Sequence, residues 1–303
     1  RKDEYKEALA GLLYQGDDRI GEGELDVRKL EYAYSWYDFA QAAKNDHYYD
    51  PASGTYKGGF VINAEGEKEA IKGRSSFIMK KKVKVYPDTL CWLKDLTYAY
   101  NEPFVREYFS HIGYDNYPVV GVNWHQAQAF CNWRTQYFNS NAGVRVQAWR
   151  LPNEVEWEYA ARGGLSGAKY PWGGPYTRNK KGCFLANFKP LRGNYISDGG
   201  FTTVPVGTYE PNGFGLYDTA GNVAEWTGDA FDESAYQVTH DLSPYYQITA
   251  KKSDNKILKR KVIRGGSWKD IAYFMQCGVR TYEYADSARS FIGFRTVRTR
   301  IEY

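Results

Sequence analysis

The stretch Arg264-Gly265-Gly266-Ser267-Trp268 is the part of the sequence that decides the fold. Its arginine carries five donors in a rigid fork, which can satisfy several loop carbonyls at once. The two glycines permit close backbone approach or a positive φ. Arg280 lies downstream, and Arg295 follows in Gly293-Phe294-Arg295. We therefore expect a structural role for five residues of this region: Arg264, Gly265, Gly266, Arg280 and Arg295.

The sequence around this stretch predicts few regular elements. Beyond Gly163 it is dominated by glycine, proline, asparagine and aromatic residues, with few periodic segments. We expect long ordered loops, short strands and little helix in this region. Loops of this kind need bound cations, or buried arginine and tryptophan donors, to satisfy their backbone groups.

Two helices and a strand are predicted upstream of these loops. One helix covers residues 153–162, where Asn153 is the N-cap and Glu156 stands at the N3 position of a capping box. The other covers residues 125–138, where residues recur at helical spacing, and Asn123-Trp124 cap its start. The apolar run at residues 117–122 predicts a short strand before it.

The first third of the sequence gives weaker signals. Val83 and Val85 alternate with lysines, which predicts a strand that ends at Pro87. In Leu30–Ala43 the first half fits a strand and the second half a helix, and periodicity alone does not decide. The polar, glycine-rich segment Asn45–Gly73 indicates a hairpin-like excursion or a mobile insertion.

The composition argues against two classes of protein. Lysine and arginine number 40 against 36 acidic residues, a formal net charge of +4 without a long basic block, so a nucleic-acid role is unsupported. No run of about 18 apolar residues occurs, so we expect no membrane-spanning segment in this sequence. The four cysteines lie far apart without metal-binding spacing, and their even number permits disulfides without implying them.

The segment Leu216–Glu225 offers oxygen ligands at alternating positions. Asp218 and Glu225 supply carboxylates, and Gly221 and Val223 can turn their backbone carbonyls inward. Calcium takes about six to eight oxygens, roughly 2.3–2.6 Å away, from such mixtures. The alternative is that Asp218 caps a turn and Glu225 pairs with an arginine. The spacing alone leaves both interpretations open.

Several segments together resemble the formylglycine-generating-enzyme (sulfatase-modifying factor) family. They are residues 150–162, 221–226, 264–268 and 293–295. The resemblance implies an α+β fold, similar in shape to C-type lectins, with few regular elements and long ordered loops. It assigns residues 107–303 to the family's domain and residues 1–106 to a family-specific N-terminal or insertion segment packed on that domain.

The same resemblance implies structural calcium. Members of the family bind one ion through positions that match Asp218, Gly221, Val223 and Glu225. They bind a second ion through positions that match Asn187, Phe188, Asp198 and Gly200. Side-chain ligands are retained at both sites, although the loop before Asp198 differs in length from the family's usual pattern.

The family's enzymes oxidise a substrate cysteine with a pair of their own cysteines, which bind copper because soft thiolates suit cuprous ion. Alignment on the RGGS segment places Asp270 at the first of these cysteines. The second falls in the run Ile271–Met275, which holds none. A carboxylate cannot replace a soft redox ligand. We therefore expect no catalytic residue and no copper, and we interpret Cys131 and Cys277 as buried free thiols.

Further motifs are similar to one subgroup of this fold, the gliding-motility lipoprotein K family (GldK or PorK) of Bacteroidetes. They are Val85–Thr89, Tyr100–Pro103, Tyr117–Trp124 and Arg264–Asp270. The resemblance implies a non-catalytic structural subunit of the type IX secretion and gliding-motility machinery. Such a lipoprotein faces the periplasm at the outer membrane, held by an N-terminal lipid anchor that would precede Arg1. It forms a ring with copies of itself and with a partner called protein N.

A ring subunit needs distinct self-contacting surfaces as well as a surface for its partner. Aromatic residues make up 17% of the chain, which suits irregular cores and protein-binding surfaces alike. The candidate contact surface is the set Tyr32, Tyr34, Trp36, Tyr37 and Phe39. The alternative is that these rings pack on the subunit's own core. Two other functions stay open: a copper-dependent sulfatase-modifying oxidase and a calcium-dependent ligand-binding module.

Overall fold

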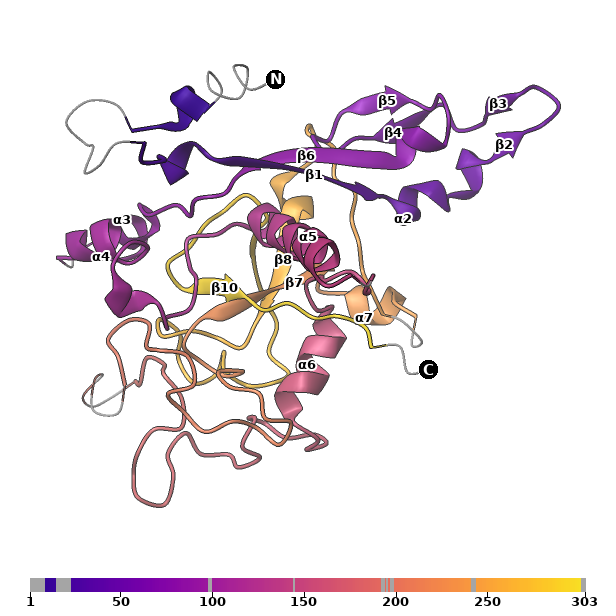
Figure 1. The fold of residues 1–303 in the computed structure, drawn as a ribbon. Coiled ribbons are helices and arrows are strands. Elements are labelled where there is room, and N and C mark those ends of the chain that lie inside the picture. The colour runs from indigo at the N-terminus through magenta and orange to yellow at the C-terminus, as the bar shows by residue number, and fades with distance from the viewer. Residues whose placement is uncertain are drawn as a thin grey trace. The chain divides into compact units, whose positions relative to one another are not determined.

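The computed structural model describes residues 9–14, 23–97, 100–143, 145–191, 194, 196, 199–240 and 244–300 of the 303-residue chain. The chain divides into two compact units, one of residues 1–65 with 69–87 and one of residues 66–68 with 88–303. The fold is α+β, with few regular elements and long loops, as the sequence predicts (Figure 1). The boundary between a family-specific segment at residues 1–106 and the family's domain at residues 107–303 stays a prediction.

The first unit is built on a long antiparallel ribbon. Its elements are η2 (Val27–Lys29), β1 (Glu31–Tyr37), α2 (Phe39–Ala42), η3 (Asn45–His47), β2 (Tyr49–Asp50), β3 (Thr55–Tyr56), β4 (Phe60–Ile62), β5 (Lys68–Ala70), η4 (Arg74–Phe77) and β6 (Ile78–Lys84). Figure 1 shows β1 and β6 side by side as the ribbon, while β2 pairs with β3 and β4 with β5. The predicted strand before Pro87 is therefore β6, and the glycine-rich segment forms two hairpins.

The change from strand to helix within residues 30–43 takes place at Asp38. Its backbone N–H donates to the Phe77 carbonyl at 2.9 Å, which closes the ladder of the ribbon. Its side chain then accepts the N–H of Gln41 at 2.9 Å and so caps α2. Val61, Phe77 and Met79 form a small buried core in this unit.

The second unit contains the larger sheet. Its elements are α3 (Cys91–Asp95), α4 (Glu102–Glu107), η5 (Ile112–Tyr114), α5 (Trp124–Asn141), α6 (Glu154–Arg162), β7 (Ala224–Ala230), α7 (Ala235–Val238), η6 (Lys256–Lys259), β8 (Arg260–Arg264), β9 (Thr281–Tyr284) and β10 (Ile292–Phe294). The strand order is β10-β7-β8-β9, with β10 parallel to β7 and the other neighbours antiparallel. Ala127 and Cys131 of α5 belong to the same core cluster as Trp226 and Ile292 of the sheet, so α5 covers the sheet (Figure 1).

Both predicted helices are confirmed together with their caps. The side chains of Asn123 and Asn153 each accept the backbone N–H of the residue three positions further on. In return, the side chains of Gln126 and Glu156 accept the backbone N–H of the capping asparagine. Gly163 ends α6 with a left-handed φ of 56°. In the part of the chain that the structure describes, no helix has both the length and the apolar character needed to cross a membrane.

The predicted strand at residues 117–122 is wrong. The backbone bonds of this segment go to other irregular chain: the Gly121 N–H donates to the Arg289 carbonyl at 2.9 Å, and the Gly121 carbonyl accepts the Asp88 N–H at 2.7 Å. Gly121 also has a φ of 68°, far from the φ of about −120° to −140° of a regular strand. The apolar residues reflect burial instead, since Val120 is fully buried in the core around Trp92.

A buried guanidinium joins the end of β8 to α6. The side chain of Arg264 has no exposed surface, and it donates to the carbonyls of Cys277 at 2.8 Å and Val279 at 2.7 Å. It also donates to the carboxylate of Glu158 and lies 3.7 Å from that of Glu154, both on α6. One side chain therefore satisfies two loop carbonyls and faces two helix carboxylates.

The neighbours of Arg264 complete this junction. Arg280 binds both carboxylate oxygens of Glu154, at 2.6 and 2.8 Å, and the carbonyl of Asp232 at 3.1 Å. Gly265 and Gly266 have φ of 92° and 65°, and a β-carbon on Gly266 would lie 2.9 Å from the backbone of the next loop. Only glycine fits both the space and the φ at that position.

Replacing Arg264 tests the junction. Arg264→Met leaves the carbonyls of Cys277 and Val279 without this donor, whereas Glu158 keeps its two bonds from Arg162. At about 1–3 kcal/mol for each buried carbonyl left unsatisfied, we expect the free energy of unfolding to fall by about 2–5 kcal/mol. The matched control is Arg106→Met, which removes an exposed ion pair with Glu102 on α4. That change should cost no more than about 0.5 kcal/mol. Urea unfolding measures both, and equal losses would contradict the assignment.

Candidate functional site

The first predicted cation site lies on the loop that leads into β7. Asp218, Gly221 and Asn222 have positive φ, at 53°, 77° and 63°. The Asn222 N–H donates to the Asn187 carbonyl at 2.8 Å, and a β-carbon on Gly221 would collide with that carbonyl. Asp218 accepts the N–H of Gly207 at 2.8 Å, so its side chain does cap a turn.

Glu225 pairs with an arginine. Its carboxylate is buried and accepts two bonds of 2.5 Å from Arg295, together with one of 2.7 Å from the indole of Trp157. Arg295 also donates to the carbonyls of Tyr217 at 3.1 Å and Asp218 at 3.4 Å. Burial opposes the charge of Arg295, but the Glu225 carboxylate outweighs it and raises the pKa of the guanidinium.

The charges at this loop suit a further cation. Burial, and after it the charge of Glu225, raise the pKa of Asp218, against the Gly207 bond and the charge of Arg295. Two carboxylates therefore share one guanidinium. No three His, Cys, Asp or Glu side chains form a metal-binding group within the described ranges. A calcium ion would depend on Asp218, Glu225 and backbone carbonyls such as those of Gly221 and Val223, and it stays a prediction.

The second predicted cation site is described only in part. Asn187 and Phe188 are buried, and the Asn187 amide donates to the Thr202 carbonyl at 2.7 Å. Because the carbonyl of Asn187 also binds the first loop, the two predicted sites adjoin at this residue. Gly200 packs closely against Thr202, where a β-carbon would lie 3.0 Å from the carbonyl oxygen. Asp198 lies outside the described residues, so this site also stays a prediction.

A hydrogen bond between Ser267 and Asp270 holds the loop in which the family's first catalytic cysteine is expected. The hydroxyl of Ser267 donates to the Asp270 carboxylate at 2.6 Å, and the Asp270 carbonyl accepts the Lys189 N–H at 2.8 Å. Burial raises the pKa of the Asp270 carboxyl despite the serine bond. Ser267 and Asp270 are three positions apart in the sequence, a spacing that favours such a side-chain bond, but the bond was not anticipated.

The cysteines are four free thiols, of which Cys91, Cys131 and Cys277 are buried and Cys183 is exposed. Burial raises the pKa of Cys277 to about 11 and that of Cys131 to about 12, and it raises the pKa of Cys91 further. These three thiols are therefore protonated at neutral pH and behave as small apolar groups, as predicted for Cys131 and Cys277.

The predicted contact surface is divided between two faces of the ribbon. Tyr32, Tyr34 and Trp36 stack along one face, with ring centroids 6.3 and 5.3 Å apart, and Tyr34 is buried. Tyr37 lies on the other face, where its ring meets that of Phe39 at 4.8 Å. Trp36, Tyr37 and Phe39 are 38%, 37% and 75% exposed, so they are the members accessible to a partner.

A buried pair on β7 and β8 was not anticipated from the sequence. Burial raises the pKa of Asp229 to about 6 and lowers that of Lys261 to about 8. Asp229 accepts the N–H of Glu154 at 2.7 Å and that of Tyr246 at 2.9 Å, and the Lys261 ammonium lies 4.1 Å from the ring of Trp124. Asp229 thus holds the start of α6 to the sheet, and Lys261 contacts the start of α5, so both groups have a structural task.

The comparison with family models decides the classification. The model of the sulfatase-modifying factor enzyme 1-like domain (FGE-sulfatase) matches residues 75–300. The chain belongs to this family. Its formylglycine-generating-enzyme-like fold is thereby established, with the arginine junction and the loop of Asp218 and Glu225 inside the matched region.

Relatives of this chain include named enzymes and a protein named inactive. The formylglycine-generating enzyme of Streptomyces coelicolor is 36% identical over 189 residues, which cover 60% of this chain and 53% of that enzyme. A Bos taurus protein named inactive C-alpha-formylglycine-generating enzyme 2 is 35% identical over 185 residues, covering 59% and 48%. Among solved structures, PvdO from Pseudomonas aeruginosa aligns with a TM-score of 0.48 and 27% identity, over 60% of this chain and 62% of that chain. The chain spans about half the length of the curated relatives named here.

Thiol titration tests the state of the cysteines. We expect one thiol, Cys183, to react rapidly with Ellman's reagent in the native protein, because the other three are buried and protonated. Denaturation should expose all four. The Cys183→Ser variant, as the matched control, should lose the rapid phase completely. A second rapid thiol in the native protein would contradict this description.

Proposed function

We propose that this protein is a non-catalytic structural subunit built on the formylglycine-generating-enzyme fold. The observation that carries the proposal is the loop after Ser267, in which no cysteine occurs before Cys277 and Asp270 stands bonded to Ser267. A protonated, buried Cys277 is a poor copper ligand, because the thiolate is the form that binds metal. Near-equal identity to an enzyme and to a protein named inactive does not favour either class.

We further propose the subgroup of gliding-motility lipoprotein K. The protein is then a subunit of the type IX secretion and gliding machinery, lying at the periplasmic face of the outer membrane through an N-terminal lipid anchor. Copies of the subunit form a ring together with protein N. Support comes from the four motifs of this subgroup and from the way in which they pack.

The subgroup motifs are structural in this chain. Asn101, Val120 and Trp268 come from three of them and meet around the buried ring of Trp92: Asn101 donates to its carbonyl, and Val120 and Trp268 share its core cluster. Asp88, from the fourth motif, bonds to Gly121. The residues that carry the resemblance therefore build the second unit, which suits a scaffold.

The exposed rings of Trp36, Tyr37 and Phe39 are the surface that we propose for assembly. Aromatic residues are enriched at protein interfaces because they bury a large area and lose few rotamers. At the end of β1, Trp36 lies on one face of the ribbon and the Tyr37–Phe39 pair on the other, so they offer two separate contact patches. Heterologous contacts between such surfaces generate closed rings.

We also propose structural calcium at the loop of Asp218 and Glu225. The support is the pair of carboxylates that share one guanidinium, and the raised pKa of Asp218, which an added cation would lower again. Calcium at this place would tie the loop to the start of β7. The Arg295 guanidinium would then be the second positive charge of the region.

Removal of calcium tests this part of the proposal. Chelation of protein held in about 10 mM calcium should lower the melting temperature by several degrees, since an ion at a ten- to hundredfold excess over its Kd contributes about 1.4–2.7 kcal/mol. Asp218→Asn should abolish that response and, because burial disfavours the charged carboxylate, should stabilise the calcium-free protein. Asp115→Asn, in an exposed turn, is the control. An unchanged melt after chelation would rule the ion out.

Assembly and copper binding test the functional proposal together. Protein extracted gently from the cell envelope should run as a multi-subunit complex by native mass spectrometry. The triple change of Trp36, Tyr37 and Phe39 to serine should release monomers, whereas Tyr100→Ser, at another exposed tyrosine, should not. Anaerobic titration of the Cys183→Ser variant with cuprous ion should show no thiolate-bound copper, because this variant lacks the exposed thiol.

Two results would overturn the proposal. A monodisperse monomer in the envelope extract would remove the ring assignment. Stoichiometric cuprous ion held by thiolates, with oxidation of a cysteine-containing peptide, would make the protein an oxidase in spite of the missing cysteine pair.

A further inference from the structure

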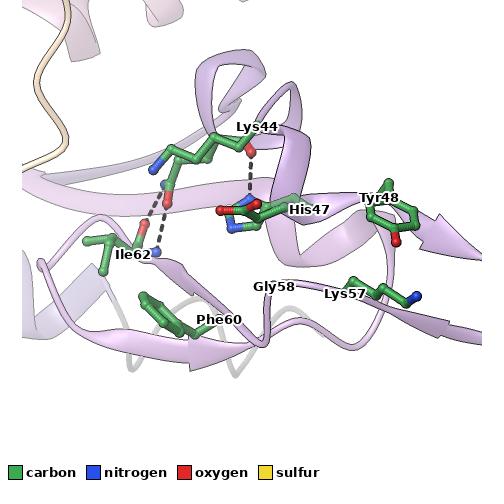
Figure 2. Close-up of a pocket in the computed structure, with 9 residues that line it drawn as sticks. Lys44, His47, Tyr48, Lys57, Gly58, Phe60 and Ile62 are labelled. Atoms are coloured by element: carbon green, nitrogen blue, oxygen red, sulfur yellow. Dashed lines mark hydrogen bonds between the residues drawn. The ribbon is translucent and has the colours of Figure 1, made fainter.

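A hollow in the first unit has chemical features that the scaffold role does not use. It lies between η3 and β4 and has a volume of about 530 Å³, inside the range of roughly 300–1,000 Å³ typical of small-molecule sites. Figure 2 shows Lys44 and His47 on one side of it, with Phe60 and Ile62 across from them. All its lining residues belong to the first unit.

One buried amide fixes the wall of this hollow. Gln41 is 1% exposed, and its side chain accepts the Ile62 N–H at 2.8 Å while donating to the Ile62 carbonyl at 2.7 Å and to Asp38 at 2.9 Å. These bonds, drawn in part in Figure 2, hold α2 to β4. The hollow is therefore preformed, which spares a ligand the entropy of ordering it.

The tautomer of His47 is fixed by the same residue. Nδ1 of His47 lies 2.7 Å from the Gln41 carbonyl oxygen, which only accepts, so Nδ1 carries the hydrogen. In the neutral ring, Nε2 is then an acceptor, and no described residue bonds to it. The ring is 9% exposed and rests against Gly58, where a β-carbon would lie 2.6 Å from Cδ2.

The other polar groups around the hollow are mixed in kind. Lys44 is a donor with a positive charge, and Asp46 is an acceptor with a negative charge. Lys57 is already engaged, because its ammonium lies 3.3 Å from Asp50 and 5.3 Å from the ring of Tyr48. A simple anion would meet Asp46 in this hollow, and a simple cation would meet Lys44.

We propose that this hollow binds a carbohydrate. A hydroxyl group donates one hydrogen and accepts at the same time. Neighbouring hydroxyls of a sugar can therefore donate one to Asp46 and another to Nε2 of His47, while either accepts from Lys44. The rings of Tyr48 and Phe60 are 51% and 41% exposed at the same hollow and offer flat faces to the C–H groups of a sugar. The site does not depend on the ring assignment or on calcium.

Saturation-transfer NMR on the full chain tests this site. The probes are methyl β-D-glucoside and its 2-acetamido analogue, for which an open site of this size should give a Kd of about 1 mM or weaker. His47→Asn keeps a donor for the Gln41 carbonyl and removes Nε2, so binding should weaken about tenfold. Phe60→Leu keeps apolar volume and removes the flat face, with a similar loss.

The control is Lys80→Met, an exposed lysine of β6 away from the lining residues, which should bind both sugars as the native protein does. Thermal melts check that each variant is folded, and Phe60→Leu carries the test if His47→Asn is not. The proposal fails if the native protein shows no transfer, or if both lining variants bind as well as the native chain. It fails equally if acetate or tetramethylammonium displaces the sugar, because the hollow would then select for charge.

Discussion

The buried guanidinium of Arg264 is the interaction on which the second unit depends. It joins the end of β8, the helix α6 and the loop after Cys277, which no strand ladder connects. Two further arginines pair with buried carboxylates in a similar way. Arg280 binds Glu154, and Arg295 binds Glu225. A buried pair adds little over apolar packing, but an unpaired member is costly. We infer that these arginines select one arrangement of the loops rather than supply most of their stability.

This architecture does not depend on disulfide bonds. None of the four cysteines forms a disulfide, and the loop at Asp270 is held by hydrogen bonds to Ser267 and Lys189. Cys277 contributes its backbone carbonyl, not its thiol, to the arginine junction. A framework of this kind can lose a redox pair without losing its shape. The proposed change from oxidase framework to structural subunit therefore needs no rebuilding of the core.

Local signals in the sequence predicted local structure well, and failed where partners come from afar. The capping boxes at Asn123 and Asn153 need only a four-residue pattern, so both helix starts were predicted correctly. The apolar run at residues 117–122 looked like a strand because burial by irregular chain leaves the same pattern as burial in a sheet. Glu225 and Arg295 are 70 positions apart, and no spacing rule could choose between an ion pair and a cation ligand.

The pair of Glu225 with Arg295 also bears on how tightly a cation can be held beside it. The Oε1 atom of Glu225 accepts a bond from Arg295 and keeps a second lone pair, so the ion pair and a metal ligand can coexist. The guanidinium nevertheless repels any added cation, and the carbonyls of Gly221 and Val223 bring no charge to offset it. Calcium affinity follows the number of charged ligands, so two shared carboxylates indicate a Kd of about 10⁻⁴–10⁻³ M. An ion held so weakly stabilises the loop only where calcium is abundant, which makes the arginine the permanent cation of this site.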